Sequence, residues 1–206
     1  MAMTKNKRFL ISYKLLFALL GFSAVVTEVA TIVERGVFNA ANFFSFFTIE
    51  GNILLSLALI LGAIAVASGK KSKKLDTFRG FTVTMMIIVG IGFAVLLSGL
   101  ENVALTAVPW DNIVLHYIMP VVALIDFIVD PPKAKLAFKK GLLWLLFPLI
   151  YLFYSLIRGA NVGWYPYPFL NPNVSSVSAI IVASLGILML GIISVWLVTW
   201  LSRRKS

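Results

Sequence analysis

A threonine and the chain's single histidine are the residues whose types and spacing could do chemistry. Thr48 belongs to a stripe with Ser45, Asn52 and Ser56, at spacings of 3, 4 and 4 residues that share one face of a helix. His116 lies in another long apolar run. A hydroxyl becomes a good nucleophile when a nearby base takes its proton, and neutral imidazole suits that role near pH 7. The pair therefore predicts acyl transfer, with Thr48 attacking an ester carbonyl.

Two further polar residues could serve the same site. Asn52, one turn from Thr48, could donate to a developing oxyanion or orient the ester. Glu28 could orient His116 as the third member of a triad does. Structural roles compete with each of these, because a threonine in an apolar helix usually bonds its own i−4 carbonyl and a buried histidine often joins helices.

Composition shows which elements must position these residues. The chain has 206 residues, of which 60% are hydrophobic and 13% charged, with a mean hydropathy of +0.98. Each apolar run is close to the ~20 residues that cross a bilayer as a helix. We expect an all-α polytopic membrane protein, a bundle of six transmembrane helices in a single domain, 1–206. The expected spans are 10–33, 43–67, 80–100, 112–129, 141–158 and 176–201.

The first apolar run follows a basic start, as in a signal peptide. Its apolar stretch is longer than a signal core, and no small-x-small cleavage site ends it. We therefore expect the first run to remain as a helix of the mature protein.

The net charge of +10 follows a topological pattern. All of the 18 Lys and Arg residues except Arg35 and Arg158 fall at the two ends of the chain or in the 68–80 and 130–140 loops. This positive-inside distribution predicts that both termini are cytoplasmic, in a membrane that we expect to be the bacterial cytoplasmic membrane. Topology also explains the lysine run at 70–74, so we expect no nucleic-acid partner. Cysteine is absent, which excludes disulfides and thiol catalysis, and we expect no cofactor or metal.

Under this topology three polar residues share one depth. Glu28, Thr48 and His116 each lie about five residues from the outer end of their expected spans, roughly 7–9 Å below the outer boundary at the helical rise. Contact between them is therefore possible, although their helices' neighbours cannot be read from sequence.

The outer loop at 164–172 is rich in proline and aromatic residues. Prolines forbid a regular helix there, and aromatic rings suit the membrane interface. The loop is either an aromatic anchor or a rigid lid over the layer of Thr48 and His116. In the second case Tyr165 and Tyr167 are candidates for substrate binding.

Three segments in this order resemble a known family: Phe46-Phe47-Thr48-Ile49-Glu50-Gly51-Asn52, then Asn112 to Pro120 with Asp126 beyond, then the loop at 165–170. The chain is similar over most of its length to the six-helix androgen-induced-protein family and its bacterial relatives. Animal members are threonine hydrolases that cleave fatty acid esters of hydroxy fatty acids. The resemblance implies that Thr48 is the nucleophile, that His116 is the essential histidine, and that a lipid ester within the bilayer is the substrate. It implies no catalytic role for Glu28, Asn52 or Asp126.

Two other functions remain open at this point. A proton-coupled carrier could use Glu28, Glu50, His116 and Asp126 as a relay, although no duplicated halves of the kind that carriers often show are visible. A lipid-binding or assembly protein would need no chemistry. Membrane lipids are expected partners in each case, and the sequence leaves the oligomeric state open.

Overall fold

The computed structural model describes residues 5–70, 72–99 and 106–204, and within these residues it contains helices and no strands. Six helical segments are long and apolar enough to cross a membrane. They are α1 (Lys5–Glu34), α3 (Phe47–Ser68), α4 (Lys73–Leu96), a combined helix (Pro109–Val129), a second combined helix (Phe138–Val162) and α9 (Val177–Leu201). This confirms the all-α, six-helix fold, as expected of an integral multi-pass membrane protein.

The two combined helices change their winding along their length. The first consists of α5 (Pro109–Ile113), the π-helical turn η1 (Val114–Ile118) and α6 (Met119–Val129). The second consists of α7 (Phe138–Gly141), the 3-10 turn η2 (Leu142–Leu145) and α8 (Leu146–Val162). Two short elements complete the fold, α2 (Ala40–Phe43) before α3 and η3 (Pro168–Leu170) before α9.

Helix ends follow local chemistry. Ser72 caps α4 by accepting a hydrogen bond from the Leu75 amide over 3.3 Å. Gly69 and Gly163 follow α3 and α8 with φ of +68° and +69°, the left-handed conformation that ends a helix and that glycine adopts without strain. Cap residues therefore mark where these helices begin and end, which hydropathy alone does not show.

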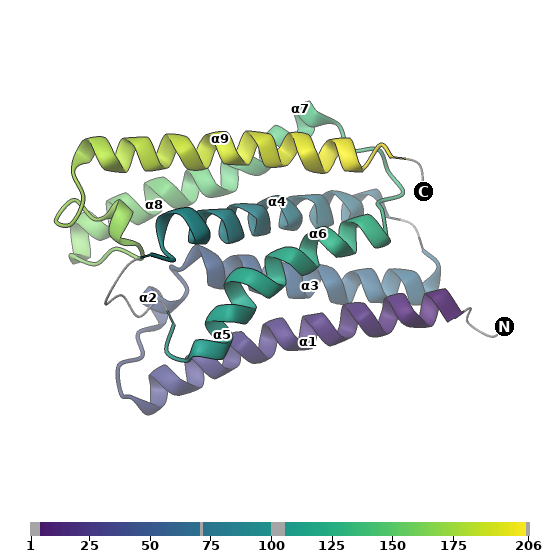
Figure 1. Ribbon diagram of the computed structural model, residues 1–206, viewed down its shortest axis with the longest axis horizontal. Coiled ribbons are helices and arrows are strands. Elements are labelled where there is room, and N and C mark those ends of the chain that lie inside the picture. Colours follow the sequence, from purple (N-terminus) through teal and green to yellow (C-terminus); the bar gives the residue numbers. More distant parts are fainter. Residues whose placement is uncertain (1–4, 71, 100–105, 205–206) are drawn as a thin grey trace.

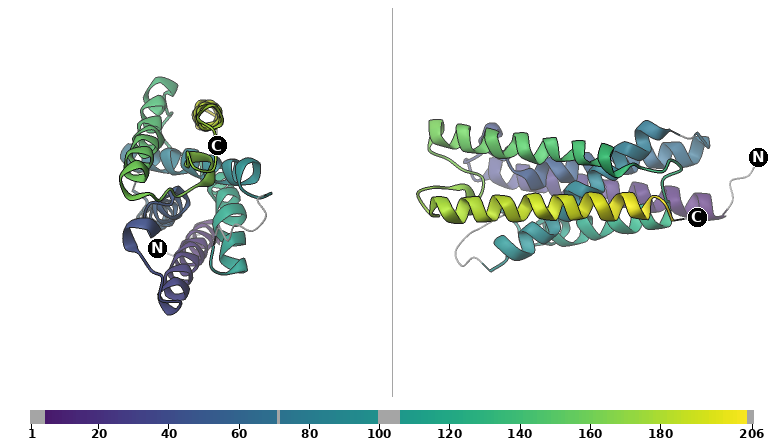
Figure 2. Two further views of the ribbon diagram at one scale, coloured as in Figure 1. Left: turned by 90° about the vertical axis from the view of Figure 1, so that its left-hand side faces the viewer. Right: turned by 90° about the horizontal axis from the view of Figure 1, so that it is seen from above.

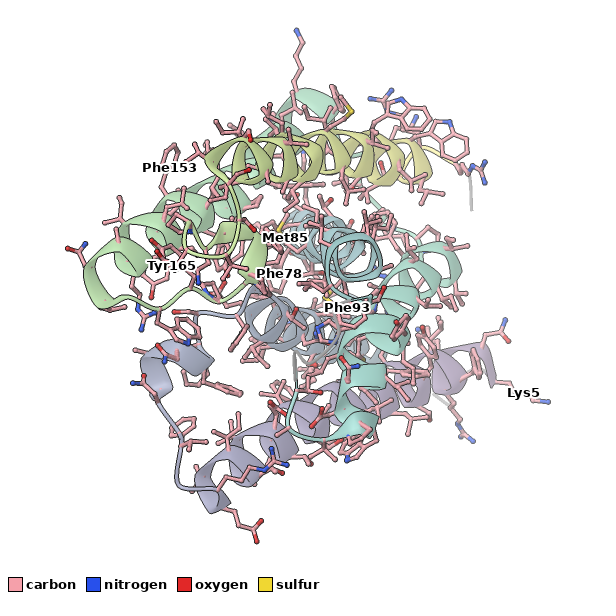
Figure 3. The ribbon with its side chains drawn as sticks, turned by 60° about the vertical axis from the view of Figure 1, so that its left-hand side comes forward. Lys5, Phe78, Met85, Phe93, Phe153 and Tyr165 are labelled. Atoms are coloured by element: carbon pink, nitrogen blue, oxygen red, sulfur yellow. The ribbon has the colours of Figure 1, made fainter. Side chains whose placement is uncertain are left out.

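The bundle is layered, and its two ends differ. The described N- and C-terminal residues lie at the same end, which we call the terminus end, together with the α3–α4 and α6–α7 connections (Figure 1). The end of α4, the start of α5 and the α8–α9 connection lie at the opposite, far end. Helices α8 and α9 stand on the other side of α3 and α4 from α1 (Figures 1 and 2). Large apolar residues such as Met85 fill the middle of the bundle, whereas Phe153 points outward (Figure 3).

A buried ionic cluster joins three helices in the terminus half. Lys14 of α1 contacts Asp126 of α6 and lies 3.0 Å from an Asp130 carboxylate oxygen, while Arg79 of α4 lies 2.8 Å from Asp126 and 3.5 Å from Asp130. Its two positive and two negative charges cancel. We refer to these four residues as the ionic cluster. In α3, Gly62 leaves room for the Lys14 chain, because a Cβ at Gly62 would lie 3.3 Å from Lys14 Nζ.

The expected spans differ from the helices mainly at the third span. Helix α4 begins at Lys73, seven residues before the expected start, and ends at Leu96; position 100 lies outside the described residues. Arg79, assigned to a loop from sequence, is therefore inside a helix and buried. Lys14 and Arg79 were both counted toward the positive-inside pattern, yet they are partners in the ionic cluster. Ser45, expected within the second span, precedes α3.

Candidate active site

Thr48 lies in the first turn of α3, where the Ile49 and Glu50 amides donate to the Phe46 carbonyl but the Thr48 amide has no helical partner. Its N–H donates to the Tyr167 hydroxyl over 3.4 Å, and the Phe47 amide and the Thr48 side chain reach the same hydroxyl. Phe46, which precedes the helix, supplies no side-chain cap, so Tyr167 from the distant loop takes that place. The start of α3 thus brings the Thr48 side chain and the Tyr167 hydroxyl together.

Tyr167 is a buried hydrogen-bonding group. Its side chain is 7% exposed, and burial raises the pKa of its hydroxyl, a rise that hydrogen bonds with Thr48 and Phe47 partly offset. The hydroxyl therefore stays protonated at neutral pH and can donate as well as accept. The sequence indicates Tyr167 only as a candidate for substrate binding. Its capacity to donate a hydrogen bond beside Thr48 becomes visible in the structure.

A cavity of about 240 Å³ opens beside Thr48. Its walls are mostly apolar and come from α3, α4, η2, α8, η3 and α9, and Thr48, Tyr151, Tyr167 and Ser184 are the hydroxyl-bearing residues of the lining. Tyr151 also donates to the Ser45 carbonyl over 2.7 Å, which fixes its ring. An apolar cavity with a few hydroxyls suits a molecule with one polar group and a hydrocarbon chain.

His116 lies in the π-helical turn η1 and is 5% exposed. Its Nδ1 is 3.1 Å from the Asn112 carbonyl oxygen. Because a carbonyl only accepts, this contact requires a proton on Nδ1 and leaves the lone pair of the neutral ring on Nε2. The ring stacks on Phe93, with centroids 4.0 Å apart. A neutral imidazole with Nε2 unprotonated is the form that can act as a base.

Phe93 connects His116 to the cavity. It lies in the bundle interior (Figure 3), lines the cavity on one side and stacks on His116 on the other. His116 itself is not part of the cavity lining. Direct contact between Thr48 and His116 stays a prediction.

Asn52 joins the elements that carry Thr48 and His116. Its side-chain amide donates to the Thr48 carbonyl over 2.9 Å and to the Leu115 carbonyl over 3.1 Å, and the side chain is fully buried. Both amide protons are therefore used, and Asn52 positions the backbone instead of donating to an oxyanion. The oxyanion role that the sequence suggested for Asn52 does not fit this geometry.

The π turn explains why Leu115 needs that donor. The Met119 amide bonds to the Val114 carbonyl, five residues back. The next bond of this type would run from residue 120 to Leu115, but residue 120 is proline and has no N–H. Pro120 also packs tightly on α4, where a Cβ at Gly90 would lie 2.9 Å from its Cβ. Proline leaves the Leu115 carbonyl free and Asn52 binds it.

Glu28 does not orient His116. Its two carboxylate oxygens accept from the Ala107 amide, at 3.0 and 2.7 Å, and Arg35 donates to the Ala107 carbonyl over 2.8 Å. Asp111 lies beside Glu28, and both side chains are buried. Glu28 thus fixes the segment that leads into α5 through its contacts with Ala107. The Nδ1 atom of His116 is paired with the Asn112 carbonyl instead.

The other tyrosine of the outer loop lies away from the cavity. Tyr165 packs its ring over α8 at Gly159, where a Cβ would lie 2.1 Å from the ring. Any larger residue at 159 would displace Tyr165. Of the two candidate substrate-binding tyrosines, the cavity lining includes Tyr167 and not Tyr165.

The carboxylates that a proton-coupled carrier would use have different surroundings in the structure and do not form a relay. Asp126 belongs to the ionic cluster, and Glu28 binds a backbone amide. Glu50 lies in the first turn of α3, where the helix dipole favours a carboxylate, and its buried Oε2 has no hydrogen-bond partner among the described residues. Within that part of the chain no three such residues gather as a metal site.

Sequence reasoning missed Phe93, Tyr151 and the positive partners of Asp126. Phe93 and Tyr151 lie within long apolar runs, where nothing distinguishes a cavity wall from a core residue. The ionic cluster did leave a signal, because Asp126 and Asp130 are four residues apart and so share a helix face.

Thr48 and Tyr167 thus meet beside the cavity, and Asn52 links the backbone of Thr48 to the π turn that carries His116. Comparisons with protein-family models, with curated proteins and with solved structures found no match for this chain.

Proposed function

We propose that this protein is a membrane-embedded lipid ester hydrolase in which Thr48 is the nucleophile and His116 the general base. The observation that carries the proposal is that Thr48 lines an apolar cavity at the start of α3, beside the buried Tyr167 hydroxyl. The resemblance to the androgen-induced-protein family points to the same two residues. It adds fatty acid esters of hydroxy fatty acids as the first substrates to test.

The proposed reaction begins at Thr48. Its Oγ1 attacks the ester carbonyl carbon while His116 Nε2 takes the hydroxyl proton, and the carbonyl oxygen becomes an oxyanion. The Tyr167 hydroxyl, held at the start of α3 by the Thr48 amide, donates to that oxygen.

The intermediate then collapses. The ester C–O bond breaks, the alcohol leaves with the proton from His116, and Thr48 carries the acyl group as an ester. Water, deprotonated by His116, attacks that ester and releases the fatty acid, which restores the Thr48 hydroxyl. No cofactor enters these steps.

The proposal places the far end of the bundle at the outer face of a bacterial cytoplasmic membrane, with the basic terminus end in the cytoplasm. A lipid ester is dissolved in the bilayer, so its carbonyl can reach a site a short way below the interface. The competing carrier function draws no support from the ionic cluster, because its charges already neutralise one another.

A covalent probe tests the nucleophile. Purified protein in detergent is incubated with an alkyl fluorophosphonate, and the adduct is located by intact mass and peptide mapping. We expect one adduct on Thr48, none in Thr48→Ala, and strongly slowed labelling in His116→Ala. Thr199→Ala is the matched control, because Thr199 is also buried but its hydroxyl donates to a carbonyl of its own helix.

The control separates chemistry from folding. Labelling of Thr199→Ala at the wild-type rate, with all variants folded by thermal melting, assigns the loss to Thr48. Absence of an adduct in the folded wild type, or equal labelling of Thr48→Ala, would refute the hydrolase.

A further inference from the structure

The cavity beside Thr48 has a mouth on the side of the bundle. Leu149 of α8 and Leu185 and Leu188 of α9 line the cavity and are at the same time 41%, 59% and 43% exposed. A side chain can do both only where the cavity reaches the surface. That surface belongs to two helices long and apolar enough to span a membrane, so the mouth faces lipid and not water.

The second combined helix packs against α9 through α7 and η2 at the terminus end, whereas α8 itself packs little against α9. At the terminus end two glycines allow close packing: a Cβ at Gly141 would lie 2.7 Å from Val195, and one at Gly191 would lie 2.8 Å from Leu145. Toward the far end α9 packs mainly on α4 and η3 instead of α8. The two helices run side by side (Figure 2), and both supply exposed lining residues, so the mouth lies in the seam between α8 and α9.

The size and chemistry of the cavity select its occupant. A dry apolar cavity of 150 Å³ holds benzene, so by proportion 240 Å³ holds about ten carbon atoms. That is enough for much of one acyl chain, and the rest of a longer chain can pass through the mouth into the bilayer. Polar lipid headgroups find few partners, because the described lining has no charged residue and its polar side chains are a few hydroxyls.

We infer that the cavity is a binding site for a single fatty acyl chain, which enters sideways from the bilayer through the seam between α8 and α9. The carbonyl end of the chain lies at Thr48 and Tyr167, and the methyl end points toward the mouth. Binding of the chain stands on the cavity itself; its role as the acyl part of the substrate rests on the proposed function.

Two glycines provide a matched pair of variants. Gly92 of α4 lines the cavity, and a Cβ placed there meets no atom within 4 Å, so a side chain at 92 enters open space without a clash. Gly186 of α9 also has open space around an added Cβ, but it is not part of the lining. Gly92→Leu therefore fills the cavity, whereas Gly186→Leu makes the same change to a helix outside it.

The test uses a photoreactive diazirine analogue of palmitic acid, with the full-length protein in lipid nanodiscs. After irradiation, cross-linked residues are mapped by mass spectrometry, with unlabelled palmitic acid as competitor. We expect cross-links on the lining residues of α8 and α9, such as Leu152 and Leu188, that the competitor removes. Displacing about two methylene groups in Gly92→Leu should weaken these cross-links about tenfold, and Gly186→Leu should leave them unchanged.

Two further variants keep the outcome interpretable. Thr48→Ala removes the proposed chemistry but not the cavity, so it should retain the cross-links even if hydrolysis is never observed. Leu188→Trp narrows the mouth from outside and serves in place of Gly92→Leu if that variant does not fold. Cross-links that scatter over outward-facing residues, or that persist unchanged in both cavity variants, would overturn the acyl-chain site.

Discussion

His116 gains its proposed role from a backbone contact. The Asn112 carbonyl holds the proton on Nδ1, which leaves Nε2 free to accept the proton of Thr48. We expect nitrogen-15 NMR of histidine-labelled protein at neutral pH to show the neutral Nδ1–H tautomer. The chain has one histidine, so the spectrum contains one imidazole. The Nε2–H tautomer, or a charged ring at neutral pH, would contradict the base assignment.

Tyr167 allows a separate test of the oxyanion contact. Tyr167→Phe keeps the ring that stacks on Phe169 and removes only the hydroxyl near Thr48. Loss of one oxyanion donor typically slows reaction about a hundredfold, so we expect a similar drop in the rate of ester cleavage. Tyr165→Phe, away from the cavity, is the control. An unchanged rate in Tyr167→Phe would restrict Tyr167 to capping α3.

For single residues, the sequence predicts which side chains belong to a candidate site better than it predicts what each of them does there. Thr48, Asn52 and His116 are conspicuous because polar groups are rare in apolar helices, and the structure buries all three. Their hydrogen bonds depend on the π turn and on a loop that arrives 119 residues later in the chain. Neither feature has a local hydropathy pattern. For this reason the sequence suggests catalytic roles for Asn52 and Glu28, whereas in the structure both side chains bind backbone groups.

Among the elements, α1, α4 and α6 are joined by the ionic cluster. Lys14→Met leaves a net negative charge buried, and removal of one partner from such a cluster costs about 3 kcal/mol. We expect a lower melting temperature in detergent, with little dependence on salt because buried pairs are poorly screened. Lys139→Met, an exposed lysine in α7, should have no effect.

A second substitution checks the electrostatic cause. Adding Asp130→Asn to Lys14→Met leaves Arg79 paired with Asp126 and restores neutrality. The double variant should therefore regain part of the lost stability. If it is less stable than Lys14→Met alone, the packing of the Lys14 chain against Gly62, and not charge, holds these helices together.

The elements themselves are largely predictable from sequence. Apolar runs of about 20 residues locate all six long helices, because lipid requires each span to satisfy its own backbone. Hydropathy fails at the polar ends: the first two turns of α4 contain Lys73, Lys74 and Asp76 and were assigned to a loop. The side chain of Ser72 is the better guide there, since it caps the helix.

For the whole molecule, the proposed orientation can be tested with single cysteines, because the natural chain contains none. Lys70→Cys and Arg203→Cys lie at the terminus end, and Asn173→Cys lies in the α8–α9 connection; all three sites are exposed. In intact cells we expect a membrane-impermeant maleimide to label position 173 and to label 70 and 203 only after permeabilisation. The opposite pattern would place the active site at the cytoplasmic face.

The arrangement of helices in space is the part that sequence did not supply. Composition and charge predict how many helices there are and how they alternate, but not that α9 packs on α4, nor that a cavity opens between α8 and α9. These features depend on small shape differences, such as the glycines at 141 and 191, which hydropathy does not register.

The ionic cluster also constrains how the chain is made. Lys14 emerges first during synthesis, while its partners Asp126 and Asp130 follow more than a hundred residues later. Until then the Lys14 ammonium must reach back toward the basic end of α1, since an unpaired charge is costly in hydrocarbon. We therefore expect helix α1 to reach its final depth only when α6 has been inserted. A chain stalled before that point carries an uncompensated charge, a feature by which quality-control proteases can tell it from the finished protein.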